Sequence, residues 1–412
     1  MRQSPLGDRA GLDSDRLAFE STVRAVKARG LVHHIAEDAR FDGRVVTLNG
    51  RGLVDFGSCS YLGLETDVRL KAAACDAVMR YGTQFSSSRA YLSAPLYREC
   101  EQRLSEMTGG YPLVLAQTTS LAHLSVLPML IDDDDAVLYD LHVHSSVHAV
   151  LPTLRQLGIP CQSAGHAGLG HLERRARALA ADHRRVFFLS DGVSMHGAIL
   201  HVEALRGVLD RVPALSAYID DAHGVGWSGR FGSGTVLGGG EGLHERMIVV
   251  MGLSQAFAAC GGAVVFPSAE LAEHVLFSGN TPLFSSPLPP AQLGACAASA
   301  LLHLSRELPP LQERLRERIA AFDDQAAREG VDVMSLDATP IRMVPVGDED
   351  RTMRLAARLI ADGHFVNVAV FPAVPVGRGT IRIMLNNHHT LLDVRVLVEA
   401  IARAMGTRRS RS

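Results

Sequence analysis

The chain has 412 residues, 47% of them hydrophobic and 21% charged, and its formal net charge is −3. This length suits one large domain with a smaller one, and the composition excludes a disordered or fibrous protein. A slightly negative chain has no global positive field to attract nucleic acid or anionic lipid. We therefore expect small molecules or proteins as partners.

The cysteines and the N-terminus predict a cytoplasmic protein. The six cysteines are scattered, without a CxxC pair or a disulfide-like spacing, which favours a reducing compartment. Residues 1–15 lack the apolar core of a secretory signal. The charge-free stretch Met247–Phe266 has the length of a membrane span, but it contains Gln255 and divides into two β-rich runs. We interpret it as two buried strands and expect no membrane span.

Residues 1–55 are predicted to form an N-terminal arm. Apolar side chains recur every three or four residues in Leu17–Ala36, which indicates a helix. The runs VVTL and LVDFG that follow are typical of short strands.

Residues 56–290 alternate short apolar runs with helical segments such as SSVHAVLPTLRQLG and HLERRARALAADH. The runs are LVLA, AVLYD, VFFLSDG, SAYIDD, MIVVMG and GGAVVF. This alternation predicts βαβ units and a mostly parallel central sheet, so the large domain is expected to be α/β. Ligands of such sheets bind beyond the carboxyl ends of the strands.

Residues 291–405 are predicted to form a smaller α+β domain. It opens with a long helix interrupted at Pro309 and Pro310. The other expected elements are four strands and two helices: VDVMSL, PIRMVPV, FVNVAVF, TIRIML, Thr352–Asp362 and Leu391–Met405. The tail, residues 406–412, is rich in Arg and Ser and is expected to be disordered.

Seven motifs follow one another in a recognisable order. They are Tyr61-Leu62-Gly63-Leu64, Ser88-Arg89, Asp140 with His144 and Ser146, Ser194-Met195-x-Gly197, Asp220-Asp221-Ala222-His223-Gly224 with a glycine-rich tail, Phe284-Ser285-Ser286 with Leu288-Pro289-Pro290, and Ile381-Arg382-Ile383 with His389-Thr390. Together they resemble the α-oxoamine synthase family. The resemblance spans nearly the whole chain and implies a fold-type-I transferase of the aspartate aminotransferase-like fold, dependent on pyridoxal 5′-phosphate (PLP).

The resemblance also implies roles for single residues. Asp220 would keep the pyridine nitrogen of PLP protonated, His144 would stack on the ring, and His223 would donate a hydrogen bond to the ring oxygen. Arg382 presents a planar fork suited to a substrate carboxylate. Ser286 matches a threonine that reaches the phosphate from the partner subunit, which implies a homodimer.

Gln255 stands where the family has the lysine that binds PLP covalently. The run Gly252-Leu253-Ser254-Gln255-Ala256-Phe257 corresponds to T-x-S-K-A-F in the family. An amide can neither form that covalent bond nor act as the base at the substrate. The chain has two lysines, Lys27 and Lys71, and both lie in N-terminal helical segments. We therefore expect PLP to be held without a covalent bond, or to be absent.

Further departures gather where the family binds phosphate and substrate. Thr119 and Ser120 replace a glycine-aromatic pair, His123 aligns with an asparagine, and another asparagine is replaced around Cys59. Hydroxyls and a helix N-terminus could still hold a phosphate. The expected cofactor contacts are Thr119, Ser120, His144, Ser194, Asp220, His223, Ser254 and Ser286. The expected substrate contacts are Arg382, Cys59 and His123, and the expected catalytic residues are His144, Asp220, His223 and Gln255.

Simpler interpretations compete with several of these roles. His142, His144 and His148 could be metal ligands, but the resemblance and ordinary placement explain them, so we expect no metal. A thiol nucleophile at Cys59 or Cys260 is less favoured than a small apolar side chain.

Two charged residues have structural alternatives as well. Asp221 matches a glutamate of the family and is favoured as polar scaffolding. Arg382 could belong to a structural ion pair instead of binding substrate.

Two functions are therefore considered. The first is an acyltransferase that moves an acyl group from a CoA or carrier-protein thioester to an amino acid or amine. It would use a histidine base (His144, His223 or His123) or take up the cofactor already joined to its amino acid. The second is a non-catalytic subunit that pairs with a lysine-bearing homologue. A designed replacement of the lysine is less attractive, because neighbouring positions have changed too.

Overall fold

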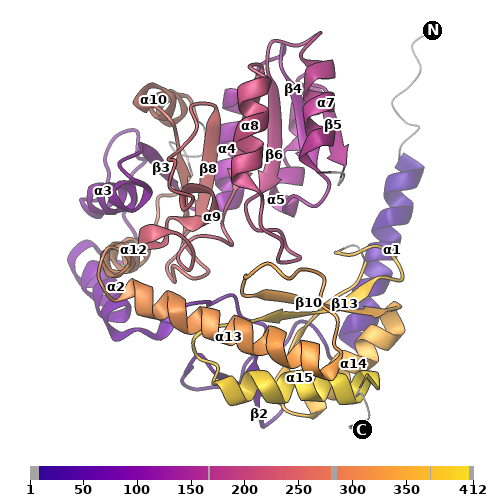
Figure 1. The fold of residues 1–412 in the computed structure, drawn as a ribbon. Helices are drawn as coiled ribbons and strands as arrows, with labels where there is room; N and C mark the ends of the chain where they lie inside the picture. Colours follow the sequence, from indigo (N-terminus) through magenta and orange to yellow (C-terminus); the bar gives the residue numbers. More distant parts are fainter. Residues whose placement is uncertain (1–8, 166–167, 280–284, 372, 408–412) are drawn as a thin grey trace. The chain divides into compact units, whose positions relative to one another are not determined.

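The computed structural model describes residues 9–165, 168–279, 285–371 and 373–407 (Figure 1). Contacts divide the chain into two compact units: Ser60–Leu315, and Met1–Cys59 together with Arg316–Ser412. The contact-based boundaries follow residues 59 and 315, whereas the sequence suggested boundaries after 55 and 290. Residues 408–412 of the expected tail lie outside the described residues.

The larger unit, Ser60–Leu315, contains a seven-stranded sheet in the order β3-β9-β8-β7-β6-β4-β5. Strand β9 runs antiparallel to β3 and β8, and the other neighbours pair in parallel. The strands are β3 (Leu113–Ala116), β4 (Ala136–Asp140), β5 (Cys161–Gly165), β6 (Val186–Asp191), β7 (Leu215–Asp220), β8 (Met247–Gly252) and β9 (Gly262–Val265). The expected α/β class with a mostly parallel sheet is confirmed.

Helices cover both faces of this sheet, because successive strand residues point to opposite sides. In β8, Val249 packs into one hydrophobic cluster while Ile248 and Val250 pack into the other. Helices α2 (Val68–Tyr81), α3 (Leu96–Thr108), α7 (Leu169–Leu179), α8 (Val202–Arg211), α9 (Gly234–Leu237) and α12 (Pro290–His303) contribute to the first cluster. Helices α4 (Thr119–Leu130), α5 (Ser145–His148), α6 (Leu151–Gln156) and α10 (Ala269–Ser278) contribute to the second.

The charge-free stretch Met247–Phe266 forms β8 and β9, as expected for two buried strands. All six residues of β8 are buried. Within the part of the chain that the structure describes, no helix combines the length and the apolar character that a bilayer crossing requires.

The smaller unit contains two three-stranded sheets, in the orders β1-β2-β11 and β10-β13-β12. Their strands are β1 (Val45–Leu48), β2 (Arg51–Asp55), β10 (Ile341–Gly347), β11 (His364–Phe365), β12 (Asn367–Ala369) and β13 (Gly379–Met384). The accompanying helices are α1 (Arg9–Ala28), α13 (Leu308–Glu329), α14 (Glu349–Ala361) and α15 (Leu391–Met405). Helix α13 begins in the larger unit and continues into this one.

Two local expectations for this region were wrong. The run VDVMSL, residues 331–336, is not a strand, since it makes a backbone hydrogen bond from Met334 N to Met343 O but no ladder. The helix break lies between His303 and Leu308, while Pro309 and Pro310 fall in the first turn of α13. Proline is tolerated there because first-turn N–H groups have no partner within the helix.

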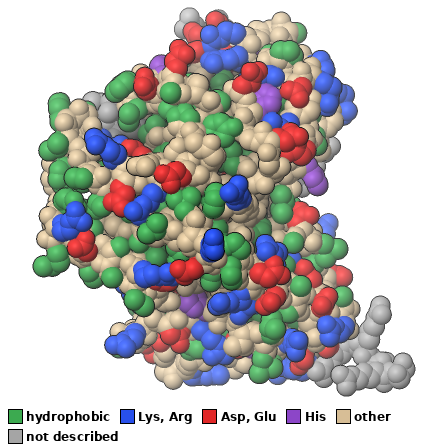
Figure 2. All heavy atoms as spheres, turned by 60° about the vertical axis from the view of Figure 1, so that its left-hand side comes forward, with side chains coloured by type: hydrophobic (Ala, Val, Ile, Leu, Met, Phe, Trp, Pro, Cys, Tyr) green, Lys and Arg blue, Asp and Glu red, His purple; other side chains and the backbone are tan. Residues whose placement is uncertain are grey.

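Charged side chains of both signs are interspersed on the face drawn in Figure 2. Arg342, in contrast to these surface residues, is a charged residue that is fully buried, in β10. Its Nε and Nη2 donate to the carboxylate of Asp323 at 2.7 and 2.6 Å, and its Nη1 donates to the carbonyls of Thr339 and Ile341. The pair ties α13 to β10, because a buried guanidinium is stable when its donors are satisfied.

His389 is a buried histidine of the smaller unit. Its Nε2 donates to the carbonyl of Asp55 at 2.8 Å, its Nδ1 accepts from the backbone N–H of Asn386, and its ring stacks on Phe56. Burial lowers the pKa of His389 to about 4. The ring is therefore neutral at pH 7, with its proton on Nε2.

We expect His389 to make the smaller unit sensitive to acid. The unfolded chain takes up a proton near pH 6.5 and the folded chain near pH 4, so stability is lost as pH falls through this window. The loss should reach roughly 3 kcal/mol. Urea unfolding between pH 7 and 4 should show a shallower pH dependence for His389→Leu than for the unchanged protein. Parallel pH profiles would contradict the assignment.

Candidate active site

The carboxyl ends of β4, β6 and β7 bring several of the expected site residues to one sheet edge. Asp220 ends β7 and lies in register with Asp191 at the end of β6. The backbone N–H of His144 donates to Asp191 Oδ1 at 3.1 Å. His223 follows Asp220 by three residues. Asp220, His223 and His144 thus gather around neighbouring strand ends.

Asp220 is a buried carboxylate with two hydrogen-bond donors. Its Oδ2 accepts from Nε2 of His123 at 2.9 Å, and its Oδ1 accepts from the backbone N–H of Ala222 at 3.0 Å. Burial acts to raise the pKa of Asp220, but the hydrogen bond and charge of His123, together with Ala222, outweigh it and lower that pKa. The site therefore holds a fixed negative charge.

His123 lies behind this carboxylate. It is fully buried, and its Nδ1 is 2.9 Å from the hydroxyl of Tyr218. Both ring nitrogens are occupied by side chains of β7. This geometry favours a positioning role, in which His123 holds Asp220 in place. It does not favour the role of base or substrate contact that the sequence suggested for His123.

Asp191 was not among the expected site residues. Burial and the neighbouring charge of Asp220 raise the pKa of Asp191 well above its usual value. Two neighbouring carboxyls shielded from water rarely both ionise, so the half-buried Asp191 favours its protonated form while Asp220 stays charged. Asp191 directly follows the apolar run VFFLS, and this position at the end of a predicted strand is the sequence feature that could have identified it as a site residue.

The two site histidines are oriented by neighbouring hydroxyls. His223 Nδ1 is 2.9 Å from the hydroxyl of Tyr61, which is fully buried. His144 Nδ1 is 2.7 Å from the hydroxyl of Ser146, and this exposed side chain stands at the N-cap of α5. Each ring is therefore anchored through its Nδ1.

Gln255 folds back over the end of β8. A Cβ atom at Gly252 would lie 2.8 Å from Gln255 Oε1 and 2.7 Å from the Cβ of Ala222. The glutamine therefore lies beside the segment that joins Asp220 to His223. Its Oε1 is buried and has no hydrogen-bond partner among the described residues. Glycine at 252 therefore lets the end of β8 pack closely against Ala222 and Gln255.

The N-terminus of α4 offers a place for an anion. Thr118 caps the helix by accepting from the N–H of Leu121. The first N–H groups of a helix have no partner within it, so those of Thr119 and Ser120 are available. A Cβ at Gly262 would lie 2.9 Å from Thr119 N, so glycine lets β9 approach this turn.

The remaining expected contacts of the larger unit are hydroxyls. Ser254 follows β8 and Ser286 precedes α12, and both side chains are exposed. Ser194 accepts from the N–H of Ala198 and lines a cavity of about 280 Å³ together with Asp191. Phe284 lies outside the described residues.

Arg382 and Cys59 belong to the smaller unit and are described within it. Arg382, in β13, is half-buried, and neither a hydrogen bond nor an ion pair to it occurs within the described residues. Arg342 on the adjacent strand has its carboxylate partner in Asp323. Among the residues that the structure describes, no structural ion pair accounts for Arg382. Cys59 is a half-buried free thiol.

Asp221 acts as scaffolding. It is fully buried, its Oδ1 accepts from the hydroxyl of Thr235 at 2.6 Å, and its Oδ2 accepts from the N–H of Val236 at 3.0 Å. Burial raises its pKa to about 7. No group of three or more metal-ligating side chains occurs in the part of the chain that the structure describes.

We expect His123→Leu to raise the pKa of Asp220, because the carboxylate loses a buried donor. The free energy of unfolding at pH 7 should fall by about 1–3 kcal/mol. Carboxyl carbon NMR titration of Asp220 and urea unfolding measure the two effects. His123→Gln keeps a donor and should retain part of both. An unchanged Asp220 pKa in the leucine variant would show that His123 does not control this charge.

Sequence comparison finds relatives along most of the chain, although no protein-family model matches it. It is 31% identical over 359 residues to an 8-amino-7-oxononanoate synthase of Symbiobacterium thermophilum, covering 86% of this chain and 89% of the relative. It is 32% identical over 393 residues to the 8-amino-7-oxononanoate synthase of Xanthomonas campestris pv. campestris (strain 8004), covering 95% of each.

Solved structures share the fold. A serine palmitoyltransferase of Sphingomonas wittichii superposes with a TM-score of 0.85 at 21% identity, covering 99% of this chain and 100% of that one. The 8-amino-7-oxononanoate synthase of Francisella tularensis superposes with a TM-score of 0.70 at 20% identity, covering 85% and 97%. With identities above 30% along most of its length, the chain belongs to the α-oxoamine synthase family of fold-type-I, PLP-dependent transferases.

Proposed function

We propose that this chain is an acyltransferase that moves an acyl group from a CoA or carrier-protein thioester to an amino acid or amine, with PLP held non-covalently. The observation that carries the proposal is the buried, ionised Asp220, fixed by His123 beside His223 and Gln255. The family's enzymes are acyltransferases that use PLP. The correspondence of Gln255 to the family's lysine is part of the proposal.

The residues of the larger unit fit PLP except at the covalent link. Asp220 would hold a proton at the ring nitrogen, and His144 and His223 would contact the ring. The phosphate contacts would be the first turn of α4 at Thr119 and Ser120, together with Ser194, Ser254 and Ser286. When bound, PLP supplies an electron sink for a bond at the amino-acid carbon. The amide of Gln255 can donate a hydrogen bond there but cannot attach covalently.

His223 is the favoured base for acyl transfer. The hydroxyl of Tyr61 anchors its ring through Nδ1, and a neutral imidazole in this position would accept the proton of an amine as the amine nitrogen attacks the thioester carbon. The new carbon–nitrogen bond replaces the carbon–sulfur bond, and the proton passes from His223 to the departing thiolate. His144 is the second candidate for this transfer.

Arg382 is proposed to bind the carboxylate of the acceptor. Its guanidinium lacks a carboxylate partner within the described residues, whereas Arg342 has one. A planar fork of donors suits a carboxylate. Ser286, which is exposed, is proposed to act across a homodimer.

Acyl transfer by the purified protein tests this function. Panels of acyl thioesters and amines, with and without PLP, should give N-acylated product, and His223→Ala should reduce kcat at least about a hundredfold. His171→Ala, on α7, is the matched control and should leave the rate unchanged. Absence of product from every pair, or equal rates for His223→Ala and the unchanged protein, would reject the proposal.

A second candidate, a non-catalytic subunit that pairs with a lysine-bearing homologue, is favoured by Gln255 itself. The buried and unpartnered Oε1 of Gln255 supplies no covalent chemistry. Light scattering and activity of the protein purified alone decide between the two candidates. A homodimer that turns over substrate without a partner would remove this candidate.

Gln255→Lys should restore the covalent link to PLP. Glycine at 252 leaves space beside this side chain, and Asp220 is already in place. After incubation with PLP and reduction by borohydride, the intact mass of Gln255→Lys should rise by one reduced cofactor. The unchanged protein and Gln255→Met should not gain this mass. The same mass for all three proteins would mean that position 255 does not face the cofactor.

A further inference from the structure

A cavity of about 350 Å³ lies in the smaller unit, between α14 and the C-terminal end of α15. Four arginines and one aspartate are among its lining residues: Arg351, Arg354, Arg358, Arg403 and Asp362. Its apolar lining is Val346, Leu355, Ala404 and Met405. The sequence predicted helices here, but no binding or catalytic role for these residues.

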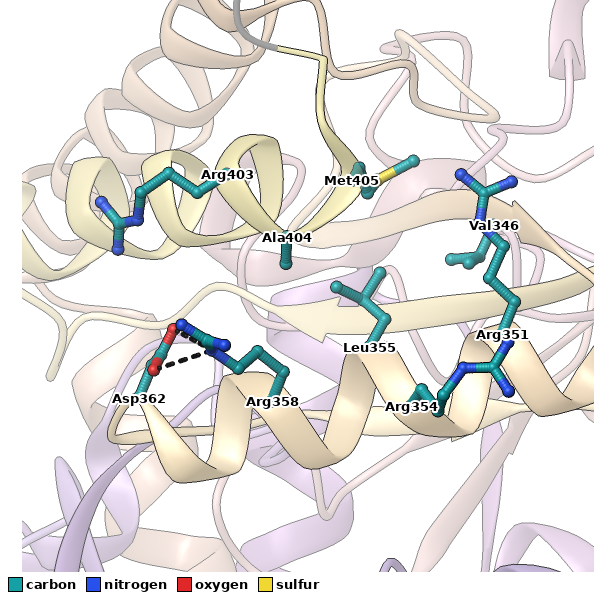
Figure 3. A pocket seen from close by; sticks show the side chains of 9 residues that line it. All are labelled: Val346, Arg351, Arg354, Leu355, Arg358, Asp362, Arg403, Ala404 and Met405. Carbon is teal, nitrogen blue, oxygen red and sulfur yellow. Dashed lines mark hydrogen bonds and ion pairs between the residues drawn. The ribbon is translucent and has the colours of Figure 1, made fainter.

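The basic side chains stand at two ends of this cavity (Figure 3). Arg351 and Arg354 lie at one end, Arg358 and Arg403 lie at the other, and Leu355 and Ala404 lie between them. Positions 351 and 358 are two turns apart on α14, about 10 Å along its axis. The cavity thus has an apolar middle and a cationic group at each end.

The carboxylates nearby leave two of these arginines without a partner. Arg358 pairs with Asp362 at 3.3 Å, and Arg354 pairs with Asp350. No hydrogen bond or ion pair to the guanidinium groups of Arg351 and Arg403, one at each end, occurs within the described residues. Each end therefore offers a guanidinium for an incoming anion.

The i,i+4 ion pairs of Arg354 with Asp350 and of Arg358 with Asp362 offset part of the repulsion among these arginines, but within the described residues no such pair involves Arg351. Arg351, Arg354 and Arg358 are spaced three and four residues apart, so like charges face one another on α14, at a cost of about 0.2–0.5 kcal/mol per pair. The chain as a whole has more acidic than basic residues. A binding role explains why positive charge is gathered here.

We propose that this cavity binds an elongated organic dianion, with a carboxylate or phosphate at each end and an apolar middle. One anionic group would contact Arg351 and the other Arg403, since guanidinium forks match both chemistries. The apolar middle would cover Leu355 and Ala404. This site is separate from the proposed acyl transfer and does not depend on it.

Calorimetric titration of the full chain with suberate, succinate and inorganic phosphate tests the site. Suberate is a long dicarboxylate that can span both ends, while succinate and phosphate can reach one. Suberate should bind at least about tenfold more tightly than either, and Arg351→Gln/Arg403→Gln should weaken it by at least about tenfold. Comparing the affinity of hexane-1,6-diol bisphosphate with that of suberate shows whether the site prefers phosphate or carboxylate groups at the two ends of the ligand.

Arg378→Gln/Arg395→Gln is the matched control. It also removes two exposed arginines, one of them on α15, but neither lines the cavity. Its suberate affinity should stay within about twofold of the unchanged protein. No suberate binding, equal affinity for succinate, or equal weakening by both double variants would overturn the proposal. Urea unfolding of both variants checks that a loss of binding is not a loss of fold.

Discussion

The candidate site depends on a carboxylate that is kept ionised inside the protein. Asp220 ends a central strand, and the ion pairs of the described residues give it no arginine or lysine partner. Hydrogen bonds from His123 and Ala222 compensate for the water that it loses. Its charge in turn favours protonation of Asp191. A fixed charge of this kind acts strongly on a bound cation, because little water is present to screen it.

Gln255 and Gly252 pack against each other at the end of β8. A Cβ at position 252 would lie 2.8 Å from Gln255 Oε1 and 2.7 Å from the Cβ of Ala222, so glycine lets the end of β8 pack closely against both residues. In the proposed function, Asp220, His223 and His144 would orient and charge a PLP ring, while the amide of Gln255 would stand in place of the covalent anchor. Under that proposal, a histidine base would act at the thioester carbonyl in place of a lysine.

Much of the fold could be predicted from the sequence. Strands β3, β4 and β8 coincide with the apolar runs, because fully buried parallel strands have nearly continuous apolar sequences. Strand β5 escaped prediction because its residues, Cys161–Gly165, are mostly polar or small at a sheet edge. The run VDVMSL was taken for a strand because periodicity does not reveal whether a pairing partner exists.

The sequence by itself determined the α/β class, the family, and the residue types available for chemistry, because burial periodicity and motif order are local properties of the chain. Only the tertiary structure decided which of these residues contact one another. It placed His123 in hydrogen-bond contact with Asp220, left Arg382 without an ion pair among the described residues, packed Gly252 against Gln255, and gathered four arginines around one cavity. These outcomes depend on which side chains meet across elements far apart in sequence, and no local pattern specifies that.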